Sequence, residues 1–360
     1  MRLNAGGLSK LVIGREDEIT TLQSYIKFSQ HTVITAPRRY GKTTLATKVL
    51  DGMSKDYLIV KVDVFEATNI EELCHNYLNA IYKSIGIVDF AKTVKESVFS
   101  LLEKFSLSYE QDGIKLGYEI SKEKNLDELV KKTFNFSEKF AKLFNKKMIV
   151  FFDEFGDIEK FGEDFLKKLR SYMQTHENVV YIFAGSQTSV INSIFLNHKN
   201  AFFNFASLMN IGFLEEKSTM KFLKNLKIEQ KELNDEVIAK LLSITKCHPF
   251  YLIKTIQETY ISSLISNTKE IRVEDVDNAI QKILSDNNAY FENIWHKLNA
   301  KKYKGTIFKS ICNNKKLSIN INPSYKSQLN KELKMESLIS ENLNATDPFL
   351  CIWLKGAQND

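Results

Sequence analysis

Residues 33–44 read Val-Ile-Thr-Ala-Pro-Arg-Arg-Tyr-Gly-Lys-Thr-Thr, an apolar run followed by a loop of residue types that bind phosphate. Such a loop must turn backbone N–H groups toward phosphate oxygens, a lysine must reach the β- and γ-phosphates, and a hydroxyl must ligate Mg²⁺. Gly41, Lys42 and Thr43 are suited to these three tasks in that order. A helix expected to open at about Thr43 adds the positive end of its dipole. The run therefore predicts a nucleotide-phosphate site.

The loop departs from the usual G-x-x-x-x-G-K-[ST] pattern at its first position, where Ala36 replaces glycine. Alanine is small enough to leave the phosphate path open, although it lacks the freedom of φ that glycine has. Gly-Lys-Thr alone could arise by chance in a lysine-rich chain, but the β-branched run before it and the helical spacing of apolar residues after it favour a strand–loop–helix unit. We expect the other loop residues to line the phosphates as well, namely Pro37, Arg38, Arg39, Tyr40 and Thr44.

A second motif follows at a suitable distance, where the apolar run 148–152 ends in Asp153 and Glu154. A short, fully apolar run is typical of a buried parallel strand, and ligands of open α/β sheets bind at the carboxyl ends of strands. Asp153 is thus expected to hold Mg²⁺ beside the phosphates, and Glu154 to orient or deprotonate the attacking water. The alternative is a solvated acidic pair after a core strand.

Arginine is scarce enough for its positions to be informative. Lysine and arginine together number 50, and six of these residues are arginines: Arg2, Arg15, Arg38, Arg39, Arg170 and Arg272. Two lie in the phosphate loop, and Arg15 precedes the first expected helix. Planar guanidinium groups suit bidentate phosphate contacts and stacking, which lysine cannot reproduce. Arg2 and Arg272 are interpreted as surface charges.

These motifs, together with several weaker ones, resemble the archaeal-type ATPases of the STAND class, P-loop switch proteins related to AAA+ and origin-recognition ATPases. The resemblance spans nearly the whole chain. It rests on five boxes in the expected order, Ile13–Glu16, Pro37–Thr43, Asp153–Phe155, Gly185–Ser186 and His248–Leu252, and it extends to Asp347–Phe349 near the end.

The resemblance implies particular roles for four of these residues. Gly14 and Arg15 would border the adenine of ATP, Ser186 would take the sensor-1 place near the γ-phosphate, and Pro249 would lie on a lid against the nucleotide. The simpler alternatives are a strand-end turn for Ser186 and a helix-start proline for Pro249.

The chain also departs from the family pattern. Cys247 stands where a glycine commonly precedes the lid His-Pro, and residues 201–213 lack the arginine often found before the lid. The second departure bears on the hydrolysis rate, because an arginine at the transition state can supply orders of magnitude in rate. Arg170 is nominated as the nearest substitute.

Composition is that of an ordinary globular protein, with 43% hydrophobic and 26% charged residues in 360. There is no apolar stretch of membrane-spanning length and no signal-peptide core, so a cytoplasmic location without membrane contact is expected. The cysteines are widely scattered, which favours reduced thiols over disulfides or zinc ligands; they are Cys74, Cys247, Cys312 and Cys351.

The expected fold class is α/β, with a parallel P-loop sheet flanked by helices, then a helical lid and a C-terminal winged helix-turn-helix. Residues 1–213 would form the core, 214–286 the lid and 287–360 the winged helix. Core strands are expected at 31–36, 58–64, 148–152, 179–184 and 208–213, and a small hairpin is expected to join 105–109 to 114–120 across Asp112–Gly113. The last domain is expected to consist of helices at 290–298, 304–312 and 324–338, followed by a strand at 349–354.

Residues 287–360 hold eleven lysines against six acidic residues, which gives +5 of the chain's formal +6. A basic winged helix is a candidate binder of double-stranded DNA, with Lys326, Gln328, Lys331 and Lys334 along the recognition helix. The alternative is a lysine-rich solvated face on a domain that docks on the core.

Two functional classes remain open. In the first, ATP binding closes the lid, slow hydrolysis to ADP resets it, and the last domain holds DNA. In the second, the chain is a nucleotide-dependent module that binds a protein or another copy of itself, with little or no hydrolysis.

Overall fold

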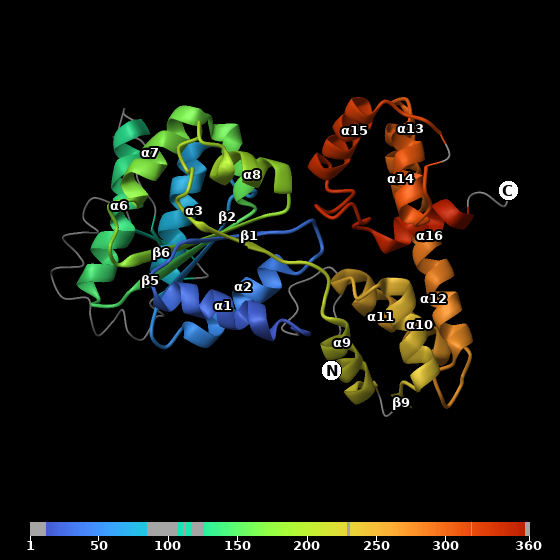
Figure 1. The fold of residues 1–360 in the computed structure, drawn as a ribbon. Helices are drawn as coiled ribbons and strands as arrows, with labels where there is room; N and C mark the ends of the chain where they lie inside the picture. The colour runs from blue at the N-terminus through green and yellow to red at the C-terminus, as the bar shows by residue number, and fades with distance from the viewer. Residues whose placement is uncertain are drawn as a thin grey trace.

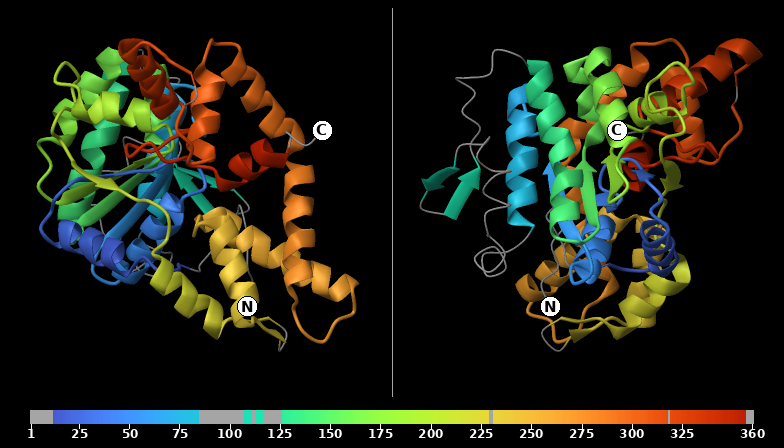
Figure 2. Two further views of the ribbon diagram at one scale, coloured as in Figure 1. Left: turned by 45° about the vertical axis from the view of Figure 1, so that its right-hand side comes forward. Right: turned by 90° about the vertical axis from the view of Figure 1, so that its left-hand side faces the viewer.

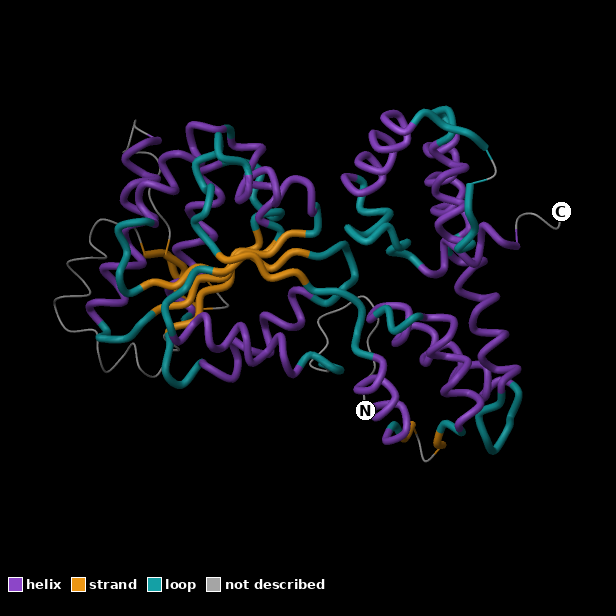
Figure 3. Tube along the Cα trace, in the orientation of Figure 1, coloured by secondary structure: helices purple, strands orange, loops and turns teal. Residues whose placement is uncertain are grey.

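The computed structural model describes residues 12–84, 107–110, 113–116, 126–228, 231–317 and 319–356. The central element is a five-stranded, all-parallel sheet in the order β2-β5-β6-β1-β7. Its strands are β1 (Thr32–Thr35), β2 (Leu58–Asp63), β5 (Met148–Asp153), β6 (Val179–Gly185) and β7 (Ser207–Asn210). All five predicted core strands are thus confirmed, with end differences of a few residues. Figure 3 shows the strands of this sheet in orange, side by side and surrounded by purple helices.

Helices cover both faces of the sheet, as the alternation of strands and helices predicts (Figure 1). On one face lie α1 (Glu16–Lys27) and α2 (Lys42–Met53). The other face carries α3 (Ile70–Lys83), α6 (Leu126–Leu143), the 3₁₀ helix η1 (Phe155–Phe161), α7 (Glu163–Met173) and α8 (Thr188–Leu196). The phosphate loop and the acidic pair therefore follow strands of a sheet that is buried on both faces.

The core on the second face is built from stacked aromatic rings. Phe152 lies nearly parallel to both Tyr77 and Phe183, with centroid distances of 5.7 and 5.8 Å. All three side chains are buried. Because Phe152 immediately precedes the acidic pair, this stack fixes the strand end from which Asp153 and Glu154 emerge.

The predicted hairpin is present as β3 (Leu107–Glu110) and β4 (Gly113–Leu116), paired antiparallel with Glu110 opposite Gly113. Asp112 of the predicted turn lies outside the described residues. Figure 2 shows this ribbon standing apart from the main sheet.

Residues 214–286 form α9 (Glu216–Asn225), α10 (Asp235–Thr245), α11 (Pro249–Ile265) and α12 (Val273–Asp286). The expectation of a wholly helical segment needs a small correction, because β8 (Lys227–Ile228) pairs with β9 (Lys231–Glu232). Cys247 has φ of +59° just before the helix-capping His248, a backbone conformation that favours glycine. This explains why glycine suits that position.

The last segment contains α13 (Asn288–Asn299), α14 (Lys304–Cys312), α15 (Pro323–Met335) and α16 (Pro348–Gly356). The predicted strand at 349–354 is wrong, because these residues form α16. The Asp347 carboxylate accepts a hydrogen bond from the Leu350 N–H, and Pro348 occupies the first helical turn, so both residues favour a helix start. The described part of the return holds one isolated antiparallel bridge, between Ile339 and Ala345.

The expectation of four reduced cysteines is also wrong in part. Cys312 on α14 and Cys351 on α16 form a disulfide, with their Cα atoms 5.0 Å apart. Cys74 and Cys247 are buried free thiols. Sequence spacing could not pair the two cysteines, because they are 39 residues apart and α14 packs against α16 only in the folded chain.

One continuous apolar core runs through α9 to α16 and includes residues on both sides of the predicted boundary at 286. The proposed lid and last domain therefore share buried contacts. Within the described ranges, no helix is both long and apolar enough to cross a membrane.

Candidate nucleotide site

The predicted phosphate loop joins β1 to α2, and its lysine is buried. Gly41 has φ of +85°, a conformation that a side chain would strain, and it immediately precedes α2. Lys42 donates hydrogen bonds from Nζ to the carbonyl oxygens of Ala36 and Pro37, at 2.9 and 3.1 Å. Burial lowers the pKa of Lys42 to about 8. The loop thus holds a partly desolvated ammonium group at the helix N-terminus, where an anion would be favoured.

Thr43 and Asp153, the two predicted metal ligands, are in direct contact. The Thr43 hydroxyl donates to Oδ2 of Asp153 at 2.6 Å, although 110 residues separate them. Burial raises the pKa of Asp153, and the hydrogen bond from Thr43 opposes that rise. One hydroxyl and one carboxylate fit Mg²⁺, which keeps several waters and takes its other ligands from phosphate oxygens. These two residues would hold the ion, and its chemistry there is charge neutralisation on the phosphates.

Glu154 is held next to Ser186, so the predicted base and the predicted sensor residue meet. Oε2 of Glu154 accepts hydrogen bonds from the Ser186 N–H at 3.0 Å and from its hydroxyl at 2.8 Å. Glu154 itself has φ of +45°. A backbone conformation of this kind costs about 1–3 kcal/mol and is found disproportionately at functional sites.

Asp63 is a neighbour that the sequence reasoning missed. It ends β2 and lies opposite Asp153 in the strand register. Burial raises its pKa, and the negative charges of Asp153 and Glu154 add to the rise. The signal was available, because the strand run 58–62, apolar except for Lys61, also ends in a carboxylate. In the part of the chain that the structure describes, however, no three acidic, histidine or cysteine groups form a metal cluster.

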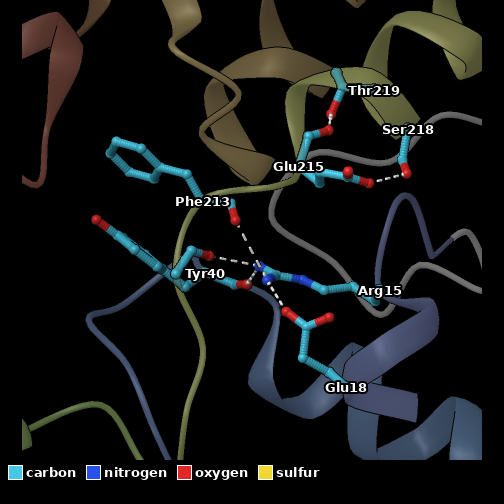
Figure 4. A network of polar contacts seen from close by, with 8 residues as sticks. Arg15, Glu18, Tyr40, Phe213, Glu215, Ser218 and Thr219 are labelled. Atoms are coloured by element: carbon cyan, nitrogen blue, oxygen red, sulfur yellow. Dashed lines mark hydrogen bonds and ion pairs between the residues drawn. The ribbon is translucent and has the colours of Figure 1, made fainter. Parts of the chain in front are cut away.

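Arg15 is used as a backbone clamp (Figure 4). Its guanidinium group donates to the carbonyl oxygens of Gly212 at 2.6 Å, Tyr40 at 3.3 Å and Phe213 at 3.4 Å, and pairs with Glu18 at 2.7 Å. The side chain is 3% exposed. Arg15 therefore ties the phosphate loop to the segment that leads from the sheet into α9. Its guanidinium group is engaged by other groups of the protein.

Gly14 lines a cleft of about 1150 Å³ between residues 12–18 and α9, together with Phe213 and Phe222. Its φ is +56°, and a Cβ atom there would come within 2.9 Å of the Cβ of Ser218. The contact of Gly14 and Arg15 with adenine stays a prediction.

The loop residues before Gly41 contact residues of the segment from α9 to α16. The Tyr40 hydroxyl donates to the carbonyl oxygen of Thr346 at 3.0 Å, and its ring meets His248 edge-on at 4.9 Å. The guanidinium carbon of Arg39 lies 4.4 Å from the centre of the Phe250 ring. Pro249 lies between these two contacting residues in sequence, at the first turn of α11. The loop is thus in contact with both of the later segments.

Arg170 is not brought to this site. Its guanidinium carbon lies 4.2 Å from the centre of the Phe205 ring, and Phe205 contacts His31. His31 and Phe205 precede β1 and β7, so Arg170 sits at the amino ends of the strands, whereas the phosphate loop follows a carboxyl end. The place of Arg170 on the helix after the acidic pair could not tell which end of the sheet it reaches, because α7 runs back along the strands toward their amino ends.

A P-loop site on a five-stranded parallel sheet defines the protein as a P-loop nucleotide-binding protein. Residues 13–255 match the model of a family described as an ATPase domain predominantly from Archaea. The match covers more than half of the sequence, and the chain belongs to this family. It is therefore a P-loop ATPase, with ATP and Mg²⁺ as its cofactors.

Solved structures support the same fold over nearly the whole chain. The Walker-type ATPase PABY2304 of Pyrococcus abyssi is 17% identical, with a TM-score of 0.66 over 98% of this chain and 99% of that one. Cdc6p from Pyrobaculum aerophilum is 10% identical, with a TM-score of 0.52 over 99% and 97%. The ORC1 protein of Aeropyrum pernix, solved in complex with DNA, is 10% identical, with a TM-score of 0.51 over 98% and 94%. At such identities the likeness shows the fold alone. Among curated proteins, none matches this sequence.

Proposed function

We propose that this chain is an ATP-driven switch of the STAND class, with a core at 1–213, a lid at 214–286 and a winged helix at 287–360. The observation that carries the proposal is that adjacent loop residues contact both proposed domains, Arg39 through Phe250 of the lid and Tyr40 through Thr346 of the last domain. A phosphate that reorients this loop would displace both contacts at once. Occupancy of the site would in this way change the position of the lid and of the last helices.

Hydrolysis in this proposal uses four side chains, and their contacts support these roles. Lys42 supplies positive charge to the β- and γ-phosphates, and Thr43 with Asp153 would hold the metal. Glu154 accepts the proton of the attacking water, after its carboxylate turns from Ser186. Because Ser186 holds that carboxylate through two hydrogen bonds, it can report whether the γ-phosphate is present.

Two variants test the switch. Lys42→Ala should abolish ATP binding, whereas Glu154→Gln should keep ATP binding and lower turnover by about 10²-fold or more. Limited proteolysis across the segment that joins the core to α9 should then show an ATP-dependent pattern that persists in Glu154→Gln and is absent in Lys42→Ala. Equal turnover of Glu154→Gln and the wild type would remove Glu154 as the base. An ATP-independent cleavage pattern would remove the switch.

DNA binding is a second candidate function. It is favoured by two exposed lysines on α15, Lys326 and Lys331, which could contact phosphates. Lys334 forms an ion pair with Glu341 at 2.7 Å, and Gln328 donates to Glu332 at 3.3 Å. Lys326 is exposed and lines a groove of about 500 Å³ together with Lys315 and Lys316. Lys331 is also exposed.

A salt titration of duplex binding tests this candidate. Removing one lysine that binds a phosphate should lower the slope of log affinity against log salt by about one. Lys326→Glu and Lys331→Glu should therefore weaken binding at all sequences, and Lys334→Glu should do so less, because Glu341 already neutralises that charge. Duplex affinity unchanged in the first two variants would leave the other class, a nucleotide-dependent module for a protein partner or a second copy.

A further inference from the structure

One catalytic group of the proposed ATPase is still unassigned, the arginine that offsets charge developing on the γ-phosphate. Five arginines fall within the described residues; three of them are engaged in other contacts, and a fourth lies in the proposed lid. Arg15 clamps backbone carbonyls, Arg39 lies over Phe250 and Arg170 sits at the opposite end of the sheet. Arg272 is an exposed residue at the start of α12 in the proposed lid.

Arg38 contacts Ser186, the side chain that also contacts the proposed base. Its Nε donates to the Ser186 hydroxyl at 3.4 Å, and that hydroxyl donates to Glu154 at 2.8 Å. The Arg38 charge also contributes to the lowering of the Lys42 pKa, so the two cations share one electrostatic environment. Arg38 is thus joined to the proposed base through a single side chain.

The guanidinium group of Arg38 has donors to spare. In the parts of the chain that the structure describes, the two terminal nitrogens of Arg38 have no hydrogen-bond partner, and only Nε is engaged. The side chain is exposed and lines a cavity of about 420 Å³ together with Ser186 and Pro37. A planar fork with two free nitrogens at the edge of the phosphate loop suits the equatorial oxygens of a transferring phosphoryl group.

We propose that Arg38 acts in cis as the arginine that stabilises the transition state of ATP hydrolysis. In that step the water oxygen bonds to the γ-phosphorus while the bond from that phosphorus to the β–γ bridging oxygen breaks. The electron pair of the broken bond stays with ADP, and the proton of the water passes to Glu154. Arg38 donates N–H groups to the γ-phosphate oxygens, whose charge must be offset most strongly at this stage.

The inference rests on the proposed ATPase mechanism, and its test uses binding as well as turnover. Wild type, Arg38→Ala and Arg38→Lys are titrated with Mg²⁺·ADP alone and with Mg²⁺·ADP plus aluminium fluoride, a mimic of the transferring phosphoryl group. Arg38→Ala should bind ADP within about twofold of wild type, but the gain in affinity that aluminium fluoride confers should be smaller by about 10²-fold or more. Its turnover should fall by about 10³-fold. Arg38→Lys should recover little, because lysine lacks the planar fork. Retained ADP binding shows that the variant is folded.

The matched control is Arg272→Ala, which removes the same charge from an exposed site in the proposed lid and should match wild type in every titration. The inference is overturned if aluminium fluoride raises the affinity of Arg38→Ala for ADP as much as that of wild type. It is also overturned if the variant loses affinity for ADP alone and for ADP with aluminium fluoride by the same factor. Turnover per subunit that rises with protein concentration in the wild type and in Arg38→Ala alike would instead assign the arginine to a second copy. Failure of the mechanism itself looks different, because wild type would then show no turnover, or Glu154→Gln would equal it.

Discussion

We expect the buried ammonium group of Lys42 to make ATP affinity depend on pH in a range where ordinary lysines do not titrate. Burial lowers its pKa from 10.5 to about 8, while Glu154 and Asp153 oppose that change and Arg38 adds to it. A bound triphosphate favours the charged form and should restore a pKa of at least the ordinary value. Above about pH 8, binding must therefore take up a proton, and affinity should fall as pH rises.

The magnitude follows from the two pKa values. With a pKa of about 8 in the free protein and 10.5 in the complex, Kd should be about 30-fold weaker at about pH 9.5 than at about pH 7. Calorimetry with ATP at constant free Mg²⁺ measures this, and repeating it in buffers of different ionisation enthalpy counts the proton taken up. The phosphates of ATP are fully ionised above about pH 8, so they do not contribute in this range.

Lys42→Arg is the matched control, because its guanidinium group stays charged throughout and its Kd should be weak but independent of pH. A wild-type Kd that stays within about threefold from about pH 7 to about pH 9.5 would refute the reasoning. An equal pH dependence in Lys42→Arg would assign the titration to another group.

Three further outcomes are expected. Tyr40→Phe removes the donor to the Thr346 carbonyl and should lower the free energy of unfolding by about 1–2 kcal/mol in a urea titration; an unchanged value would mean that the bond contributes nothing. Phe152→Ala opens the aromatic stack and should cost about 3–5 kcal/mol in the same measurement, and a cost below about 1 kcal/mol would contradict the packing described above. Peptide mapping without reductant should recover Cys312 linked to Cys351, and recovery of both as free thiols would exclude the disulfide.

Those parts of the site that are local in sequence were predictable. The loop that ends in Gly41-Lys42-Thr43 follows directly from a strand, and Asp153 directly ends another, so chain geometry alone directs both to the carboxyl edge of a parallel sheet. The contact between Thr43 and Asp153 confirms that expectation. The helix α16 could also be predicted from sequence, because Asp347-Pro348 is a helix-start signal. The apolar run after it, however, fits a short strand equally well by its pattern.

The sequence by itself determined the class of site, through strand ends, a tight glycine turn and helix-start residues that act over a few positions. Only the tertiary structure decided which arginine contacts Ser186, the partner of Glu154, because Arg38 and Ser186 are 148 residues apart and Arg170 lies at the amino ends of the strands. The tertiary structure also decided that Arg15 donates hydrogen bonds to backbone carbonyl oxygens, including that of Gly212. Such choices depend on how distant segments pack, and a long side chain near a motif in sequence can point to either end of a sheet.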